Sequence, residues 1–456
     1  MRALPGRRRI EGLDAFRGCL VALRILVGSQ VAGIAAAVMT HPDGFGLTVA
    51  DLVFPGFLFI MGMAIAVSMS ALLRLPDAHG PDRRTHIVRV VRRALLLYAI
   101  GMFLNAYPFL PEILEHLRFV GVLQRLAVVY LVVSLLYVTC AWALLPSAAA
   151  PGGAGAVPVG ALARGGRFLA KAFLLGGFPL LCGTLWIVAT YSFHSPWPEC
   201  AGVPGLVPAC SLEAYVDTNV WGVRHNYDGG AFDPEGLVST LVAVVNCWAG
   251  LVVGMDVVRN KARYGAVGGV RGRASLLIAI GTVCLGSGLA LGMVIPIGKH
   301  LWTPSYALVT VGIMIVGFAL VLLAFDGGLW PTADASAGAC ESDAGSAADC
   351  RPRPEHRGVG GAVRRGLAAM GDTLVALGRN PLFFYVLSEL VVTTLDYLPV
   401  RYHGKEGSLW TAGAEVGLAS WMPGPLASMV WAVLWLLLFY VPLARLLVAR
   451  GWYIRV

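Results

Sequence analysis

The chain has 456 residues, of which 57% are hydrophobic and only 13% are charged, and its mean hydropathy is +0.73. Soluble domains carry about 25% charged residues, so this composition excludes an ordinary soluble globular protein and predicts a polytopic membrane protein. The net charge of +9 does not indicate a nucleic-acid-binding protein, because no Gly-rich phosphate loop or aromatic-basic motif accompanies it. Most basic residues fall in alternate segments between apolar stretches, as expected of cytoplasmic loops.

Apolar stretches of membrane-spanning length recur along the chain. We expect about ten transmembrane helices, at about 13–38, 52–73, 91–105, 119–145, 168–191, 235–257, 274–295, 303–325, 372–398 and 426–448. The predicted fold class is therefore an all-α polytopic membrane bundle. The alternate basic loops place both termini in the cytoplasm. Asp14, Arg17 and Arg24 interrupt the first stretch, which argues against a cleaved signal peptide.

Three segments between these stretches have distinct compositions. Residues 146–167 and 326–365 are rich in Ala and Gly with few large apolar residues, so we predict flexible cytoplasmic linkers there. Residues 192–234 form a polar periplasmic loop that is long enough to suspect a function. We treat 1–456 as one transmembrane domain. The chain shows no internal repeat, which argues against a transporter built from duplicated halves without excluding one.

Four of the nine cysteines lie in polar segments. Cys200 and Cys210 share the loop 192–234, and Cys340 and Cys350 share the second linker. Neither pair has CxxC spacing with nearby histidines, so we predict no zinc site. Because the first loop is assigned to the oxidising periplasm, we expect Cys200 and Cys210 to form a disulfide, and Cys340 and Cys350 to stay reduced.

Polar side chains gather where loops enter helices. Ionisable groups at membrane depth are costly, so they are usually paired or functional. Four loop-to-helix junctions bring such groups to the same expected side of the membrane: His41 with Asp51, Gln124 with Arg125, Asp233 with Glu235, and Lys299 with Trp302. One such cluster can arise by chance, whereas four on one side indicate a site.

Six motifs carry a family resemblance. They are GLDAFRG (12–18), HPDGFGLTVADLVFPGFLFIMG (41–62), GVLQR (121–125), FDPEGLVSTL (232–241), GKHLWTPSY (298–306) and GRNPLFFYV (378–386). In this order they resemble the transmembrane acetyltransferases related to heparan-alpha-glucosaminide N-acetyltransferase. The resemblance covers essentially the whole chain. It implies transfer of the acetyl group of acetyl-CoA to the amine of a glucosamine-type sugar.

The resemblance also implies catalytic roles. His41 matches the essential histidine of the family, and an imidazole suits a general base for the attacking amine. Direct transfer and an acetyl-histidine intermediate both remain open. Asp51 is the second catalytic candidate; alternatively, it pairs with Arg125 or caps its helix. Relatives carry an asparagine in the first helix that is thought to position the acetyl group. Here Gln30 supplies the amide, or the role is absent.

The remaining site residues are assigned to binding. Gln30, Gln124, Arg125, Asp233, Glu235, Lys299 and Trp302 are candidates for the acceptor site. Asp233 and Glu235 also suit a simple helix start, and Lys299 and Trp302 suit membrane-interface anchors. Guanidinium groups fit phosphate oxygens, so Arg17, Arg92 and Arg93, together with Asn380, are assigned to acetyl-CoA. No metal is expected.

These expectations combine into one hypothesis. A bacterial inner-membrane enzyme uses cytoplasmic acetyl-CoA, through a tunnel between helices, to acetylate an amino sugar at the periplasmic face. O-acylation of a periplasmic glycan and amino-sugar transport are the alternatives. No large accessory portion precedes Gly12 in this sequence, so a heparan chain is not the expected acceptor. A homodimer is among the expected assemblies.

Overall fold

The computed structural model describes residues 10–42, 44–70, 83–144, 161–264, 267–330, 359–402 and 404–454. These residues form two compact units made of non-contiguous segments. The first unit lies within Met1–Met39, Asn260–Ile280 and Ile315–Arg455, and the second within Thr40–Arg259 and Gly281–Met314. Cys340, Cys350 and the central parts of both expected linkers lie outside the described residues.

The chain is a multi-span membrane protein. Seven helical segments of the described part are long and apolar enough to cross a membrane, and a bent pair makes an eighth. They are Ala50–Ser68, Val122–Cys140, Gly165–Ser192, Leu237–Arg259, Val267–Leu291, Pro304–Phe325 and Gly424–Ala449, with the bent pair Gly366–Gly378 and Pro381–Asp396. The other two expected spans are the long helices α1 (Glu11–Gly28) and α3 (Arg83–Ala106), which contain four and five charged residues.

Several helices begin earlier than the hydropathy pattern predicts. The helix α3 already begins in the basic segment that precedes residue 91, and α6 (Ala161–Ala172) begins inside the first expected linker. Through a π-helical turn, α6 continues into α7 (Phe178–Ser192). After α10 (Lys261–Tyr264), the basic loop gives way to α11 (Val267–Leu291). Arg and Lys are good helix formers whose charged ends reach past an apolar span, so the helix outlasts the hydrophobic pattern.

In the first unit, one expected helix is two. The prediction of a single helix over 372–398 is wrong, because α14 (Val359–Gly378) and α15 (Pro381–Asp396) meet at an angle of 85°. Pro381 has no N–H to continue the ladder, and Asn380 leaves the helical region with φ −131°. The helix α14 also begins inside the second expected linker.

The first unit also contains the remaining C-terminal elements. Strands β1 (Pro399–Tyr402) and β2 (Lys405–Ser408) pair antiparallel, with Arg401 opposite Glu406, so one short hairpin is added to the helical fold that the sequence predicts. Each strand has only four residues, too few for an alternation of polar and apolar residues to predict a strand from the sequence. Further along the chain are α16 (Leu409–Ala414), α17 (Gly424–Trp435) and α18 (Val441–Ala449).

The second unit is built on a close crossing of α2 (Val53–Ser68) and α9 (Leu237–Arg259). A Cβ added at Gly250 would lie 1.8 Å from the Phe59 carbonyl oxygen, and one at Gly254 would lie 2.8 Å from Met63 Cα. Residue numbers therefore rise together along the two helices, which means that they run parallel. Small residues permit such backbone contact between membrane helices.

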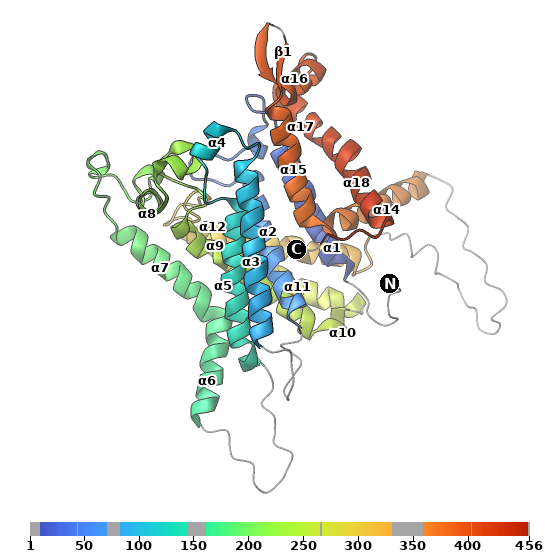
Figure 1. Cartoon of the computed structure of the whole chain (residues 1–456). Coiled ribbons are helices and arrows are strands. Elements are labelled where there is room, and N and C mark those ends of the chain that lie inside the picture. The colour runs from blue at the N-terminus through green and yellow to red at the C-terminus, as the bar shows by residue number, and fades with distance from the viewer. Residues whose placement is uncertain are drawn as a thin grey trace, which may run out of the picture. The chain divides into compact units, whose positions relative to one another are not determined.

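Other helices of the second unit surround this pair (Figure 1). In this unit α3 packs lengthwise on α5 (Val122–Cys140), while α5 and α7 both contact α9. The N-terminal part of α12 (Pro304–Phe325) belongs here too. Because α2 and α9 run parallel, their N-terminal ends lie at the same end of the unit.

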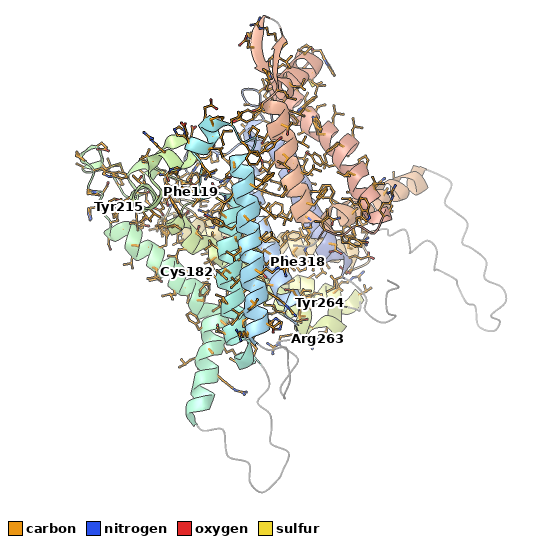
Figure 2. The ribbon with its side chains drawn as sticks, viewed as in Figure 1. Phe119, Cys182, Tyr215, Arg263, Tyr264 and Phe318 are labelled. Atoms are coloured by element: carbon orange, nitrogen blue, oxygen red, sulfur yellow. A yellow bond between two sulfur atoms is a disulfide. The ribbon has the colours of Figure 1, made fainter. Side chains whose placement is uncertain are left out.

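The loop 192–234 is structured. It contains α8 (Leu212–Trp221) and a disulfide between Cys200 and Cys210, as expected from the sequence. The short helix α4 (Pro111–Glu115) lies in the loop between α3 and α5. Phe119, which follows α4 and is labelled in Figure 2, has its ring 4.8 Å from that of His225, so the two loops touch.

The glycine crossing gives a testable expectation. Replacing Gly250 with Ala forces a Cβ against the Phe59 carbonyl, and overpacking of this kind costs about 1–3 kcal/mol. We expect the melting temperature of the detergent-solubilised protein to fall by several degrees. Gly183→Ala is the matched control, because nothing lies within 4 Å of that position on α7. An equal response of the two variants would contradict the packing argument.

Candidate active site

Two loops of the second unit meet around His41. The first loop leads into α2 and contains Thr48-Val-Ala-Asp51, in which the Thr48 N–H donates to Asp51 Oδ2 at 2.9 Å. This is the return contact of a capping box, and it orients the carboxylate. The second loop precedes α12. The Gly46 N–H donates to the Ile297 carbonyl at 2.8 Å, which joins the two loops.

At their meeting point lies a three-residue polar cluster. His41 Nδ1 is 2.6 Å from Asp51 Oδ1, and Lys299 Nζ is 2.8 Å from His41 Nε2 and 3.9 Å from Asp51 Oδ1. The Asp51 side chain is fully buried, whereas that of His41 is 44% exposed. The cluster therefore combines a fixed carboxylate with an imidazole that a substrate can reach.

The contacts assign the protons of the imidazole. A carboxylate only accepts, so Nδ1 of His41 carries the hydrogen that is donated to Asp51. Nε2 then presents its lone pair. The Lys299 ammonium lies 2.8 Å from Nε2 and 3.3 Å from Nδ1, so it sits beside the ring rather than in line with that lone pair. A histidine held in this tautomer by a carboxylate is arranged as a general base.

A tight turn places Lys299. The Trp302 N–H donates to the Lys299 carbonyl at 3.0 Å, and Trp302 adopts a left-handed backbone with φ +49°. Such a conformation is unfavourable for a bulky residue and persists where the surroundings enforce it. The Trp302 side chain is fully buried and donates to Asn246 Oδ1 at 3.0 Å. The reading of Trp302 as a membrane-interface anchor is therefore wrong.

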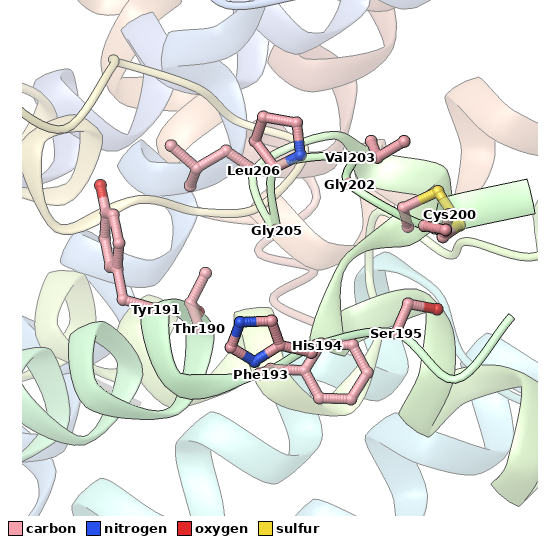
Figure 3. A pocket seen from close by; sticks show the side chains of 13 residues that line it. Thr190, Tyr191, Phe193, His194, Ser195, Cys200, Gly202, Val203, Gly205 and Leu206 are labelled. Carbon is pink, nitrogen blue, oxygen red and sulfur yellow. A yellow bond between two sulfur atoms is a disulfide. The ribbon is translucent and has the colours of Figure 1, made fainter. Parts of the chain in front are cut away.

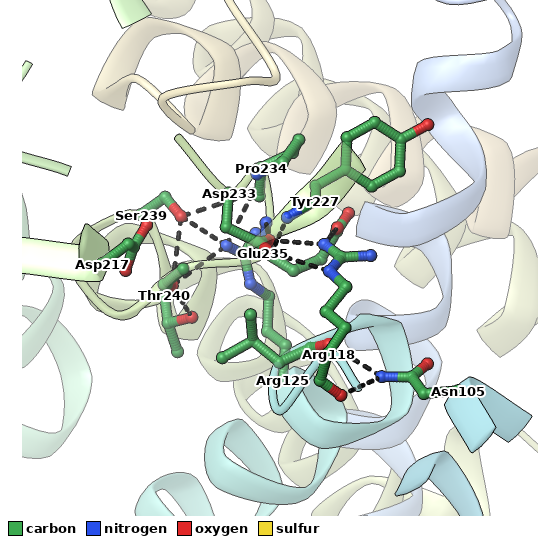
Figure 4. Close-up of polar contacts among 12 residues, drawn as sticks. Asn105, Arg118, Arg125, Asp217, Tyr227, Asp233, Pro234, Glu235, Ser239 and Thr240 are labelled. Carbon is green, nitrogen blue, oxygen red and sulfur yellow. Dashed lines mark hydrogen bonds and ion pairs between the residues drawn. The ribbon is translucent and has the colours of Figure 1, made fainter. Parts of the chain in front are cut away.

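A second cluster lies at the start of α9 (Figure 4). Arg118 donates through Nε to Asp233 Oδ2 at 2.7 Å, and through Nη2 to both Asp233 and Glu235. Asp233 also accepts the backbone N–H groups of Tyr227 and Glu235, each at 2.9 Å. Asp233 is thus saturated, and its role in this structure is to hold the loop before α9.

Charge complementarity stabilises this cluster. Burial opposes the charge on Arg118, but Asp233 and Glu235 outweigh it and raise its pKa. Burial likewise favours the neutral form of Glu235, yet the nearby cations Arg118, Arg125 and Lys299 lower its pKa below the ordinary value. Glu235 is therefore a carboxylate at neutral pH. The Lys299 charge acts on Glu235 and Lys299 also contacts His41, so it couples the two clusters electrostatically.

Arg125 is buried against the same loop. Its Nη2 donates to the Pro234 carbonyl at 2.8 Å and to the Ser239 hydroxyl, and its guanidinium carbon lies 5.0 Å from the centre of the Trp302 ring. Within the described part of the chain, Nε and Nη1 of Arg125 have no hydrogen-bond partner. The alternative that Arg125 pairs with Asp51 is wrong in this structure, because Asp51 pairs with His41 and Lys299.

The four junctions expected from the sequence all lie in the second unit. The Trp302 ring meets the Phe54 ring at 5.1 Å, one turn beyond Asp51, and also contacts Arg125. The Tyr306 hydroxyl donates to the backbone carbonyl of Asp51 at 2.7 Å. Aromatic side chains therefore connect the His41 cluster to Arg125 and the neighbouring Arg118 cluster, which we call together the Arg125 cluster.

Gln124 and Gln30 each form contacts within their own unit. Gln124 faces α3, where it lies 3.7 Å from Met102 Sδ. Gln30 belongs to the first unit, where its Nε2 donates to the Leu26 carbonyl at 3.0 Å and its Oε1 accepts from Ser428 at 2.9 Å. The Gln30 amide thus serves a local hydrogen-bond network.

The residues assigned to acetyl-CoA belong to three elements: Arg17 lies on α1, Arg92 and Arg93 on α3, and Asn380 directly before α15. Arg17 lies 3.5 Å from the Asp14 carboxylate, Arg92 is exposed on α3, and Arg93 lies over the Tyr130 ring. Asn380 is fully buried. Its Nδ2 donates to the Trp452 carbonyl at 3.1 Å and its Oδ1 accepts the Ile454 N–H at 2.8 Å, so it holds the C-terminal segment.

Sequence reasoning missed three residues of these clusters, Thr48, Arg118 and Tyr306. The T-x-x-D spacing signals Thr48, but Arg118 and Tyr306 gain their roles only through partners far away in the chain. Among the described residues, no group of three His, Cys, Asp or Glu side chains is placed to hold a metal ion.

Comparison with known proteins adds the family. Residues 9–164, which include both His41 and Arg125, match the family described as heparan-alpha-glucosaminide N-acetyltransferase, catalytic. These residues belong to that family. The resemblance inferred from the motifs is confirmed.

Two curated relatives extend the similarity. The human heparan-alpha-glucosaminide N-acetyltransferase is 30% identical over 336 residues, covering 67% of this chain and 46% of the relative. The mouse protein of the same name is 28% identical over 321 residues, covering 65% of this chain and 46% of the relative. The matched region thus spans slightly less than half the length of these acetyltransferases.

Asp217 on α8 makes the site region sensitive to pH. Its side chain is fully buried, Oδ1 accepts the Leu237 N–H at 3.2 Å, and Oδ2 has no partner among the described residues. Burial raises its pKa to about 7; the Leu237 N–H and Arg125 oppose the shift, while the Asp233 charge adds to it. The ordinary value is about 3.9. Between these values the folded state holds a proton that the unfolded state has released.

The stability from this proton is therefore lost as the pH rises through 7. We expect the melting temperature to fall by about one to two degrees between pH 6 and pH 8, and Asp217→Asn to flatten that fall because an amide stays neutral. Asp228→Asn is the matched control, since Asp228 is exposed and asparagine tolerates its φ of +53°. A wild-type slope in Asp217→Asn would refute this assignment.

Proposed function

We propose that this chain is a membrane acetyltransferase that transfers the acetyl group of acetyl-CoA to the amine of a glucosamine-type sugar. The observation that carries the proposal is the 2.6 Å contact between His41 and the buried Asp51, with Nε2 of His41 left as an acceptor. The family match over residues 9–164 supports the reaction class, and the printed name of the curated relatives supports the amino sugar.

In the proposed reaction, the amine nitrogen attacks the thioester carbonyl carbon while Nε2 of His41 takes an amine proton. The C–N bond forms, the C–S bond breaks, and the proton ends on the departing thiolate, which leaves as free CoA thiol. Asp51 keeps the imidazole in the required tautomer and stabilises its cationic form. Lys299, 2.8 Å from Nε2, is placed to donate to the developing oxyanion once the substrate amine takes its place beside the imidazole. We favour this direct transfer.

The substrates would be held by groups near this cluster. Arg125 offers Nε and Nη1 to a substrate oxygen, and Glu235 is an anion suited to an ammonium or a sugar hydroxyl. Arg92, exposed on α3, is available to a CoA phosphate. The cofactor-binding role of Asn380 would require it to release the C-terminal segment, so we do not retain it.

The first test is enzymatic. Purified protein should release free thiol from acetyl-CoA when glucosamine is present. Loss of a general base typically costs 10²–10⁴-fold in rate, so His41→Ala should lower turnover by that factor without changing the melting temperature. His116→Ala is the matched control, because His116 is exposed and contacts only the Glu112 carbonyl among the described groups. Wild-type turnover in His41→Ala would remove His41 from the mechanism.

The second test concerns sidedness. The basic loops assign both termini to the cytoplasm and the His41 cluster to the periplasmic side. We propose that acetyl-CoA enters from the cytoplasm and that its long, mostly uncharged pantetheine arm reaches the cluster between helices. The hydrocarbon core is about 30 Å thick, and the charged nucleotide cannot enter it unaided.

Sealed inside-out vesicles separate the two sides. With acetyl-CoA outside and glucosamine preloaded inside, they should accumulate N-acetylglucosamine in the lumen. Vesicles without acetyl-CoA provide the baseline. If product forms only when both substrates share one side, cross-membrane transfer fails while the acetyltransferase assignment stands.

A further inference from the structure

A pocket of about 600 Å³ lies in the disulfide-bearing loop of the second unit (Figure 3). One wall is the end of α7 and the residues that follow it, Thr190 to Ser195. The opposite wall is the segment from Cys200 to Leu206, closed by the disulfide to Cys210. The volume falls within the range of about 300–1,000 Å³ that is typical of small-molecule sites. The pocket shares no residue with the His41 or Arg125 clusters.

The walls are fixed by contacts of their own. The Phe193 ring lies 5.4 Å from the Tyr215 ring on α8, and Trp197 lies 6.1 Å from the same tyrosine. The Ser211 hydroxyl accepts the Ala214 N–H at 3.2 Å and so caps α8, directly after Cys210. The disulfide and this aromatic group hold the pocket open before a ligand arrives, which lowers the entropy cost of binding.

Its polar groups are poised for hydroxyl groups. His194 Nδ1 donates to the Ser192 carbonyl at 3.3 Å, which leaves Nε2 as an acceptor. The Ser195 hydroxyl accepts from the Trp197 N–H at 3.3 Å, which leaves its own hydrogen to donate. Thr190 is only 2% exposed, and its hydroxyl has no partner among the described residues. Donors and acceptors therefore converge from one wall.

The rest of the lining selects the ligand class. No Arg, Lys, Asp or Glu is among the lining residues, so neither a phosphate nor an amine finds a counter-charge. Tyr191 and Phe193 supply aromatic surface, and Val203 and Leu206 face them across the pocket. A neutral molecule with an apolar ring face and hydroxyl groups at its edge matches both features.

We propose that this pocket is a binding site for a neutral saccharide, with a pyranose face against Tyr191 and its hydroxyls on Thr190, His194 and Ser195. The site does not depend on acetyl transfer. It gives the loop 192–234 a recognition role that neither the motifs nor the relatives assign.

The test is binding to the full chain in lipid nanodiscs, because maltoside detergents carry a competing sugar. The probes are the β-1,4-linked disaccharide of N-acetylglucosamine and maltose, with affinities measured by calorimetry and contacts by saturation-transfer NMR. At least one probe should bind to the wild type. Tyr191→Ala, which removes an aromatic wall, and Val203→Trp, which fills the cavity, should each weaken binding at least tenfold.

Two controls locate the site. Tyr397→Ala removes an equally exposed tyrosine outside the pocket, and it should leave the affinity unchanged. His41→Ala should also leave it unchanged, which separates this site from the proposed acetyltransferase centre. Absence of binding by both probes, wild-type affinity in Tyr191→Ala, or loss of binding in His41→Ala would each overturn the proposal. Thiol release by the wild type is measured in parallel, so failure here is distinguishable from failure of the proposed function.

Discussion

The parallel crossing of α2 and α9 is the constraint on which the site depends. Gly62, Gly250 and Gly254 let the two backbones touch, because a Cβ at any of them would collide with the other helix. Parallel helices have their N-terminal ends together, so Asp51 before α2 and Asp233 before α9 lie at one end of the unit. Helix N-terminal ends favour negative charge, which helps to explain why carboxylates gather there.

The two clusters solve the problem of buried charge differently. Around α9, Arg118 neutralises Asp233 and Glu235, and every oxygen of Asp233 is engaged. Asp233 therefore stabilises the loop and has no oxygen left for a ligand. In the His41 cluster, the buried Asp51 is matched by an imidazole that remains 44% exposed. The second arrangement leaves an acceptor nitrogen within reach of a substrate. We therefore assign a structural role to Asp233 and a candidate catalytic role to His41.

Glycines in the motifs that carry the family resemblance allow close packing in both units. A Cβ added at Gly18 would lie 1.8 Å from the Leu374 carbonyl oxygen, and one at Gly378 would lie 1.8 Å from that of Asp14, so α1 and α14 also touch backbone to backbone. Gly298 leaves room for the Phe45 ring beside the His41 loop. The motifs therefore contain residues needed for helix packing as well as candidate reactive residues. For this reason, a motif match by itself does not show which residues take part in a reaction.

The sequence by itself determined the membrane class, most of the spanning helices, the family and the four polar junctions, because hydropathy, helix-start chemistry and motifs are local patterns. It did not determine the break at Asn380-Pro381, because a proline near a helix start is compatible with a continuous helix. It did not determine the exposed hairpin either, because its strands are only four residues long. Tertiary structure alone decided the pairing of the charges. Lys299 meets His41 across 258 residues, and Arg118 meets Asp233 across 115. The partner of a buried charge is set by which helix ends pack together, and no local pattern encodes that distance.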